Sequence, residues 1–359
     1  MSVYLSMIAA TMVLGFLANR SSGKYRIRIG WILAILAVWV FVYGFRYNTG
    51  SDFEGYHFFY NRIGELNQSF EEFTAGQRDF LFARLEYYIF QFSGGNWIAF
   101  SVILGILTYL PVLLVVRDES PNFMLSSLLF IFTTQYFSGF NGVRQAIAVA
   151  FSLYAYYKFF KKGKYLPYTI LMFLAFGFHS TALIAIPFHF LSKLRLSSGV
   201  FKVVVVLMIV SYVFLWDLWD YLIEFLEMIG QNKLAEDYAD ATTDGSGLLR
   251  AFVHLLPAII GLMYKRIILR DHKGAESEIM LILISGIFML FSTKYWLFGR
   301  VATYFNIHTI VFLPKLESIF TKNSKQTAML LMSLLYFAYM CAMLLHGDGG
   351  CLPYTFYPL

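Results

Sequence analysis

WIAFSVILGILTYLPVLLVV, residues 97–116, is a run of twenty residues without a charged side chain. A helix rises about 1.5 Å per residue, so this run can cross the roughly 30 Å of hydrocarbon in a bilayer. Similar runs occur at residues 29–45, 278–290 and 327–345. None of these runs alternates between apolar and polar residues as a strand of a membrane barrel does. A continuous apolar run can form all of its backbone hydrogen bonds within lipid only as a helix. The sequence therefore predicts an all-α membrane protein.

The composition of the whole chain supports this class. Of the 359 residues, 58% are hydrophobic and 14% are charged. In a typical soluble protein roughly half of the residues are apolar and about a quarter are charged. The net charge of +6 comes largely from short basic loops, which indicates membrane orientation and not nucleic-acid binding. The N-terminal run lacks a basic region and a cleavage pattern, so we expect it to be a retained span. Cys341 and Cys351 are expected to be free thiols.

About ten full spans follow from hydropathy, in one integral membrane domain over residues 1–359. They lie near residues 2–19, 28–45, 97–116, 122–139, 142–160, 200–216, 248–266, 277–294, 300–315 and 326–346. Lysine and arginine concentrate in the loops near residues 20–28, 160, 268 and 320, which we expect to be cytoplasmic. The polar segments near 46–96 and 217–247 are then external loops.

One segment conflicts with this orientation. If residues 165–193 formed a single crossing, the basic segment near residue 195 would be external and the acidic loop at 217–247 cytoplasmic. A re-entrant hairpin of two half-helices, broken at residues 177–180, removes the conflict. Such a break is tolerated in a membrane only where it lines a polar cavity. One long tilted helix is the alternative.

Three arginines reach the external face in this topology. Arg46 ends the second span, Arg144 lies in "FNGVRQAIA" at residues 140–148, and Arg300 lies in "WLFGRVATYF". Arginine at an external boundary opposes the positive-inside preference and needs an anionic partner. Guanidinium groups bind phosphate oxygens in pairs, so three of them suit a pyrophosphate. For any single arginine, contact with lipid headgroups or a nearby aspartate is the alternative.

Other polar residues complete the candidate site. Asp52 follows a Gly-Ser turn and could orient or deprotonate a sugar hydroxyl, or could simply cap a helix. Glu86 lies in an aromatic-rich stretch, and His179 at the predicted break could act as base or hydrogen-bond donor. A histidine satisfied by neighbouring carbonyls is the alternative for His179. Further substrate contacts are predicted at Asn141, Gln145, Tyr56 and Tyr304.

We expect neither a metal nor a cofactor. The remaining histidines have no ligand spacing, and the sequence contains no glycine-rich nucleotide loop and no serine-centred elbow.

The combination of these segments resembles the EpsG family, a branch of the Wzy-type polymerases of bacterial surface polysaccharides. The resemblance rests on "FRYNTGSDFEGYHFFY", "ARLEYYIF", "FNGVRQAIAVAFSLYAYYKF", "AFGFHSTALIAIPFHFL" and "FGRVATYFNIHTIVFLPKL", in this order. It implies a fold like that of the membrane-embedded GT-C glycosyltransferases. It also implies a site at the external face of the bacterial cytoplasmic membrane.

The resemblance further implies the reaction. Undecaprenyl-pyrophosphate-linked oligosaccharides would serve as donor and acceptor, with membrane lipid, a chain-length regulator and a flippase as further partners. The family's arginines fall on Arg46, Arg144 and Arg300, its acidic residue on Asp52 and its histidine on His179. Tyr87 stands where a proline is expected after Glu86, which weakens the case for a role of Glu86.

Two other functions stay open from the sequence. A transporter of a lipid-linked or anionic solute could use the same arginines at a broken helix, although no internal repeat favours it. A membrane O-acyltransferase acting on surface glycan could use His179 as its base.

The predicted topology can be tested by cysteine labelling. A cysteine at Ser198 should be protected from a membrane-impermeant maleimide in intact cells, and one at Thr242 should react, because the hairpin places residues 192–199 inside. External labelling at Ser198 would contradict the hairpin.

Overall fold

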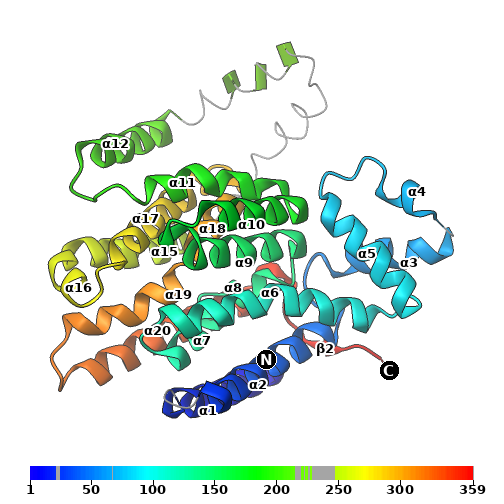
Figure 1. The fold of residues 1–359 in the computed structure, drawn as a ribbon, viewed down its shortest axis with the longest axis horizontal. Helices are drawn as coiled ribbons and strands as arrows, with labels where there is room; N and C mark the ends of the chain where they lie inside the picture. Colours follow the sequence, from blue (N-terminus) through cyan, green and yellow to red (C-terminus); the bar gives the residue numbers. More distant parts are fainter. Residues whose placement is uncertain are drawn as a thin grey trace. The chain divides into compact units, whose positions relative to one another are not determined.

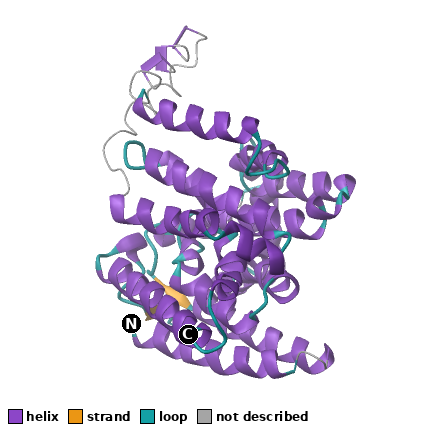
Figure 2. Cartoon of the chain, turned by 90° about the vertical axis from the view of Figure 1, so that its left-hand side faces the viewer, coloured by secondary structure: helices purple, strands orange, loops and turns teal. Residues whose placement is uncertain are grey.

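The structure is a computed structural model that describes residues 1–21, 25–66, 68–214, 220–221, 223–224, 227–228 and 247–358. It confirms the all-α class, because helices account for 79% of the protein (Figure 2). Two compact units are present, one made of residues 1–183 and 320–359 and the other of residues 184–319. We call them unit 1 and unit 2. The external loop predicted at 217–247, with Thr242, lies almost entirely outside the described residues.

Unit 1 contains both ends of the chain (Figure 1). Its elements are α1 (Ser2–Arg20), α2 (Tyr25–Gly44), β1 (Arg46–Tyr47), α3 (Phe53–Glu65), α4 (Phe70–Thr74), α5 (Phe80–Ser93), α6 (Trp97–Glu119), α7 (Phe123–Phe132), α8 (Gln135–Ser138), α9 (Val143–Lys158), η1 (Phe160–Lys162), α10 (Tyr165–Phe178), α20 (Lys325–Leu345), η5 (Asp348–Gly350) and β2 (Thr355–Phe356).

Unit 2 consists of helices over its described residues. They are α11 (Ala185–Leu191), α12 (Gly199–Val213), α15 (Leu248–Met263), α16 (Lys265–Asp271), α17 (Ala275–Phe291), α18 (Leu297–Asn306), α19 (Thr309–Phe312) and η4 (Leu313–Ile319), and the short η2 (Ser180–Ile184) lies at the boundary of the units.

Among the described residues, three helices are long and apolar enough to cross a membrane by themselves. They are α1, α6 and α20, and shorter apolar helices cover Arg28–Gly44, Phe123–Phe132, Tyr165–Phe178 and Ser180–Leu191. Helix α6 begins where the Asn96 side chain accepts from Ala99 N at 2.9 Å, a cap that satisfies one of the free amides of the first turn. Ten spans and a GT-C-like arrangement stay predictions.

Several predicted spans are interrupted. The span expected at 122–139 breaks after α7, where Thr134 has a left-handed backbone (φ 63°), and continues only as the single turn α8. The span expected at 248–266 bends by 80° between α15 and α16. Two polar residues, Thr133 and Thr134, separate α7 from α8, and the Thr133 hydroxyl donates to Leu129 O at 2.7 Å. A hydropathy average over such a segment cannot locate the break.

The break predicted at residues 177–180 is present. Helix α10 ends at Phe178, His179 has extended dihedrals (φ −158°, ψ 123°), and η2 begins at Ser180. Its two arms belong to different units, so the re-entrant hairpin itself stays a prediction.

Contacts between segments of unit 1 occur at both ends of its helices. At one end, Asn19 Nδ2 donates to Asn122 Oδ1 at 2.9 Å, and Lys158 pairs with Asp118. At the other end, β1 pairs antiparallel with β2, with Arg46 opposite Phe356. Strands that pair must lie on one side of a membrane, so the segment after α2 and the C-terminal segment share a side. This agrees with the topology predicted from the basic loops.

The sequential helices of unit 1 pack as neighbours. Helix α2 packs against both α1 and α6. Helix α9 lies between α6 and α10 (Figure 1). An aromatic group holds α2 to α7 and α8, with Trp39 stacked on Phe130 of α7 at 5.2 Å and the hydroxyl of Tyr136 in α8 donating to Trp39 O at 2.8 Å. Burying a tyrosine is favourable here because its hydroxyl has a backbone partner.

Unit 2 is built around α17, which packs against α15 and α18. The α-carbon of Gly286 lies so close to Leu255 that a Cβ there would meet its atoms at 2.6 Å. Small residues that let helix backbones approach closely are typical of membrane helix pairs. A buried ion pair, Lys315 Nζ to Glu278 Oε1 at 2.7 Å, joins η4 to α17.

Candidate functional site

Three segments of unit 1 meet at the carboxylate of Asp79. Arg144 Nη1 lies 3.4 Å from Asp79 Oδ2, and His179 Nδ1 lies 3.3 Å from the same oxygen. The backbone N–H of Ser180 donates to Asp79 Oδ1 at 3.2 Å. Asp79 immediately precedes α5, Arg144 lies in the first turn of α9, and His179 follows α10. We call these residues the Asp79 cluster.

Asp79 is held in its ionised form. It is only 8% exposed, and burial alone would raise its pKa. The hydrogen bond and charge of His179, the charge of Arg144 and the Ser180 amide more than compensate, so the pKa of Asp79 lies below its ordinary value. The cluster therefore contains a fixed negative charge at neutral pH.

Arg144 has free hydrogen-bonding capacity. One terminal nitrogen faces Asp79, and its guanidinium lies over the rings of Phe82 at 4.8 Å and Tyr56 at 5.7 Å. Among the described residues, Arg144 Nε is buried and has no hydrogen-bond partner. The side chain is 31% exposed and stands at a helix N-terminus, where the helix dipole also favours anions. An anion with several oxygens fits these donors.

His179 is oriented by the same carboxylate. When the ring carries a single proton and Nδ1–H donates to Asp79, Nε2 is left as an acceptor. A carboxylate that fixes the tautomer of a histidine in this way prepares it to accept a proton. The extended backbone at His179 turns the chain out of α10, which lets the next amide reach Asp79.

Glu86 lies seven residues after Asp79, about two turns further along α5. It is 3% exposed, and its Oε1 has no hydrogen-bond partner among the described residues. Burial raises its pKa to about 7, although the nearby charge of Arg144 acts in the opposite direction. On the neighbouring helix, burial raises the pKa of Tyr56 to about 12, so this hydroxyl keeps its proton and can donate to an anion.

The predicted residues Asp52, Asn141 and Gln145 lie at the start of α9. Asp52 is the first residue before α3, but its side chain does not cap that helix. Instead Asp52 Oδ2 accepts from Gly142 N at 2.8 Å, at the N-terminus of α9. Asn141 Nδ2 donates to Gly349 O at 2.8 Å, and the Gln145 side chain lies against Gly142. These contacts connect the turn around Asp52 with the start of α9.

Arg46 is engaged by the protein itself. Its side chain is 3% exposed, it donates to Tyr43 O at 2.5 Å and Thr49 O at 3.2 Å, and it lies over the rings of Tyr43 and Phe140. Its predicted contact with a pyrophosphate stays a prediction. In this structure Arg46 stabilises the turn that leads to Asp52.

Arg300 and Tyr304 belong to unit 2. Arg300, in the first turns of α18, is exposed, and its guanidinium lies 4.6 Å from the Trp296 ring centre. Tyr304 is buried in the same helix. The convergence of the three arginines stays a prediction, because unit 1 holds two of them and unit 2 the third.

Asp79 is absent from the candidates that the sequence suggested. The sequence contains a weak indication of its role, because Asp79 is the acid directly before the aromatic-rich stretch that holds Glu86, "RDFLFARLEYY". Buried arginine and histidine both require an anionic or polar partner. A search for that partner in the predicted external loop would have included Asp79.

Metal donors do not gather in the part of the chain that the structure describes. No group of three histidine, cysteine, aspartate or glutamate side chains is arranged to hold an ion there, and Cys341 and Cys351 are free thiols.

The raised pKa of Glu86 predicts pH-dependent stability. Its ordinary value is 4.5, so the folded protein binds this proton more tightly than the unfolded chain, and stability falls as the pH rises through about 7. The loss is on the order of 3 kcal/mol for a shift of this size. Glu86→Gln should therefore raise the melting temperature of the detergent-solubilised protein at pH 8.5 and change it little at pH 5. The exposed Glu71→Gln is the control, and an equal gain at both pH values would contradict this account.

Comparison with known proteins identifies the family of the chain. The model of the EpsG family matches residues 29–356, which is nearly the whole chain and includes the Asp79 cluster. The comparisons with curated proteins and with solved structures give no match. EpsG is a family of Wzy-type polysaccharide polymerases. Because its model matches nearly the whole chain, the chain belongs to the EpsG family.

Proposed function

We propose that this polymerase joins lipid-pyrophosphate-linked oligosaccharides at the external face of the bacterial cytoplasmic membrane, and that the Asp79 cluster is its catalytic centre. The observation that supports this best is that one carboxylate holds both a guanidinium suited to phosphate and an imidazole suited to take up a proton. Glycosyl transfer from a pyrophosphate needs both groups.

The reaction exchanges one bond for another. The hydroxyl oxygen of an acceptor sugar bonds to the anomeric carbon of the donor, and the bond from that carbon to the phosphate oxygen breaks. His179 Nε2 takes the hydroxyl proton, and the lipid pyrophosphate departs with the electron pair. Arg144 stabilises the charge that develops on the departing oxygens, with the Tyr56 hydroxyl as a further donor.

Asp79 acts through its two neighbours in this proposal. It fixes the tautomer of His179 and offsets the positive charge that the ring acquires. It also holds Arg144 against the rings of Phe82 and Tyr56, so the guanidinium is oriented before the substrate arrives. Asp52 holds the start of α9 through Gly142, and the buried Glu86 is a second group that titrates beside Arg144.

The external site, the undecaprenyl donor, a metal-independent reaction and the participation of a flippase and a chain-length regulator are parts of the same proposal. A pyrophosphate already departs well, so cationic stabilisation and one base are sufficient without a metal. Strand β1 and Asp79 both belong to residues 46–96, the segment that the loop charges predict to be external, and β2 pairs with β1, which supports this side for the site.

Arg144→Lys should lower polymer formation about a hundredfold. Lysine keeps the charge but loses the planar fork, which costs on the order of 3 kcal/mol in a partly desolvated site. The assay uses purified protein with lipid-linked repeat units, and donor affinity should weaken too. Arg84→Lys, on the exposed face of α5, is the matched control. Wild-type activity of Arg144→Ala would show that this arginine only contacts lipid headgroups.

His179→Gln should separate turnover from binding. Loss of a general base lowers kcat about a hundredfold or more, whereas donor affinity should stay within about twofold. Asp79→Asn should lower kcat and weaken donor binding together, because it disturbs both the histidine and the arginine. The exposed His346→Gln provides the control. If His179→Gln weakens donor binding but leaves kcat unchanged, His179 is a ligand of the pyrophosphate and not the base.

A further inference from the structure

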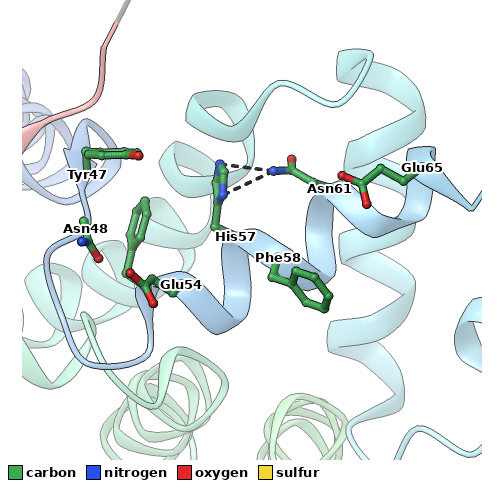
Figure 3. A pocket seen from close by; sticks show the side chains of 8 residues that line it. Tyr47, Asn48, Glu54, His57, Phe58, Asn61 and Glu65 are labelled. Atoms are coloured by element: carbon green, nitrogen blue, oxygen red, sulfur yellow. Dashed lines mark hydrogen bonds between the residues drawn. The ribbon is translucent and has the colours of Figure 1, made fainter.

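A polar hollow lies on the external side of unit 1, beside α3. It has a volume of about 210 Å³ and is lined by Tyr47 and Asn48 before α3 and by one face of the helix (Figure 3). That face presents Glu54, His57, Asn61 and Glu65. We call this hollow the α3 groove.

The spacing of the lining residues gives the groove its length. Residues 54, 57, 61 and 65 recur at intervals of three and four, which places them on one side of a helix. The eleven steps along the helix from residue 54 to residue 65 cover about 16 Å. The groove is therefore longer than a single sugar ring and follows the helix axis.

The central polar residues of the groove, His57 and Asn61, are held by ring contacts and hydrogen bonds. The His57 ring stacks on Phe53 at 5.6 Å and meets Trp97 edge-on at 4.9 Å. His57 Nε2 lies 3.3 Å from the Tyr357 hydroxyl, and Asn61 Nδ2 lies 3.3 Å from the ring nitrogens. Burial lowers the pKa of His57, so the ring is neutral at neutral pH. These contacts fix the polar groups before a ligand binds.

The lining combines hydrogen-bond acceptors with apolar faces. Glu54 and Glu65 supply carboxylate oxygens, which accept strongly from hydroxyl groups. Tyr47 and Phe58 line the same hollow and are 41% and 52% exposed, so their rings are accessible for stacking. No lysine or arginine is among the lining residues. Sugar rings, with polar edges and apolar faces, match this combination, whereas an anionic ligand would meet like charge.

Helix α3 links the groove to the Asp79 cluster. Tyr56, whose ring lies 5.7 Å from the Arg144 guanidinium carbon, is the direct neighbour of His57 on this helix. One helix thus presents one side toward the arginine and another toward the groove. A substrate with its pyrophosphate at Arg144 could place sugars along α3.

We propose that the α3 groove binds the oligosaccharide part of a lipid-linked substrate, with a preference for neutral or amino sugars over uronates. This rests on the proposed function. The sugars come either from the donor or from the acceptor, since both contain the same repeat unit. Kinetics with a substrate that can act only as donor, or only as acceptor, distinguish these two sources.

Binding is tested with a soluble probe, the oligosaccharide that mild acid releases from the lipid-linked intermediates of cells lacking this protein. Purified full-length protein should give saturation-transfer NMR signals with this probe. Phe58→Ala and the pair Glu54→Gln with Glu65→Gln should each weaken its affinity about tenfold, because a ring face or two charged acceptors are lost. The exposed Glu71→Gln and the site variant Arg144→Lys should leave the affinity unchanged. Unchanged affinity in both groove variants would overturn the proposal, and tighter binding in the glutamine pair would overturn the preference for uncharged sugars.

Kinetics then identify the source of the sugars. A lipid-linked repeat unit with its acceptor hydroxyl capped can act only as donor, and the soluble oligosaccharide, which lacks pyrophosphate, can act only as acceptor. Groove variants should raise the KM for one of them about tenfold with kcat unchanged, and a KM unchanged for both overturns the proposal. If the wild type binds the probe through the groove but transfers nothing from the capped donor, the groove stands and the proposed function fails.

Discussion

A single carboxylate organises the polar part of unit 1. Asp79 binds Arg144, His179 and the Ser180 amide, and these lie 65, 100 and 101 residues away in the chain. A buried carboxylate without partners would be costly, as would a buried guanidinium without an anion. Because each group offsets the burial cost of the others, the start of α5, the start of α9 and the end of α10 are held together. The same arrangement leaves unused capacity on Arg144 and His179, which a substrate can fill.

A second set of contacts fixes the turn that precedes α3. Gly50 N and Ser51 N donate to the carbonyls of Gly350 and Gly349 at 2.9 and 3.0 Å, so the C-terminal segment closes over this turn. Gly50 has φ of +100°, and a Cβ there would meet Phe140 O at 2.8 Å, which explains why the turn requires glycine. Arg46 and Asp52 belong to this set. Both polar residues therefore serve the architecture that places α3, and α3 in turn carries Tyr56 beside Arg144.

Membership of the EpsG family gives these groups a chemical context. In the reaction that we propose, the protein holds a charged leaving group near a membrane surface and a neutral sugar chain beside it. The Asp79 cluster offers cationic and proton-accepting groups, whereas the α3 groove offers neutral and acidic ones. The cationic side chain of the Asp79 cluster suits the pyrophosphate of the proposed lipid-linked glycan, and the neutral and acidic groups of the α3 groove suit its sugars.

The sequence by itself determined the class of fold and most of the candidate polar residues. Uncharged apolar runs predicted helices at α1, α2, α6 and α20, and the conflict between charge and span count predicted the break at His179, because hydropathy and loop charge depend on local composition. Only the tertiary structure decided which polar residues pair. Asp79 was not identified, Arg46 is occupied by carbonyls, and Asp52 bonds to Gly142 without capping α3. The reason is physical: partners in a folded chain are set by the packing of helices, and residues one hundred positions apart carry no local signal of their contact.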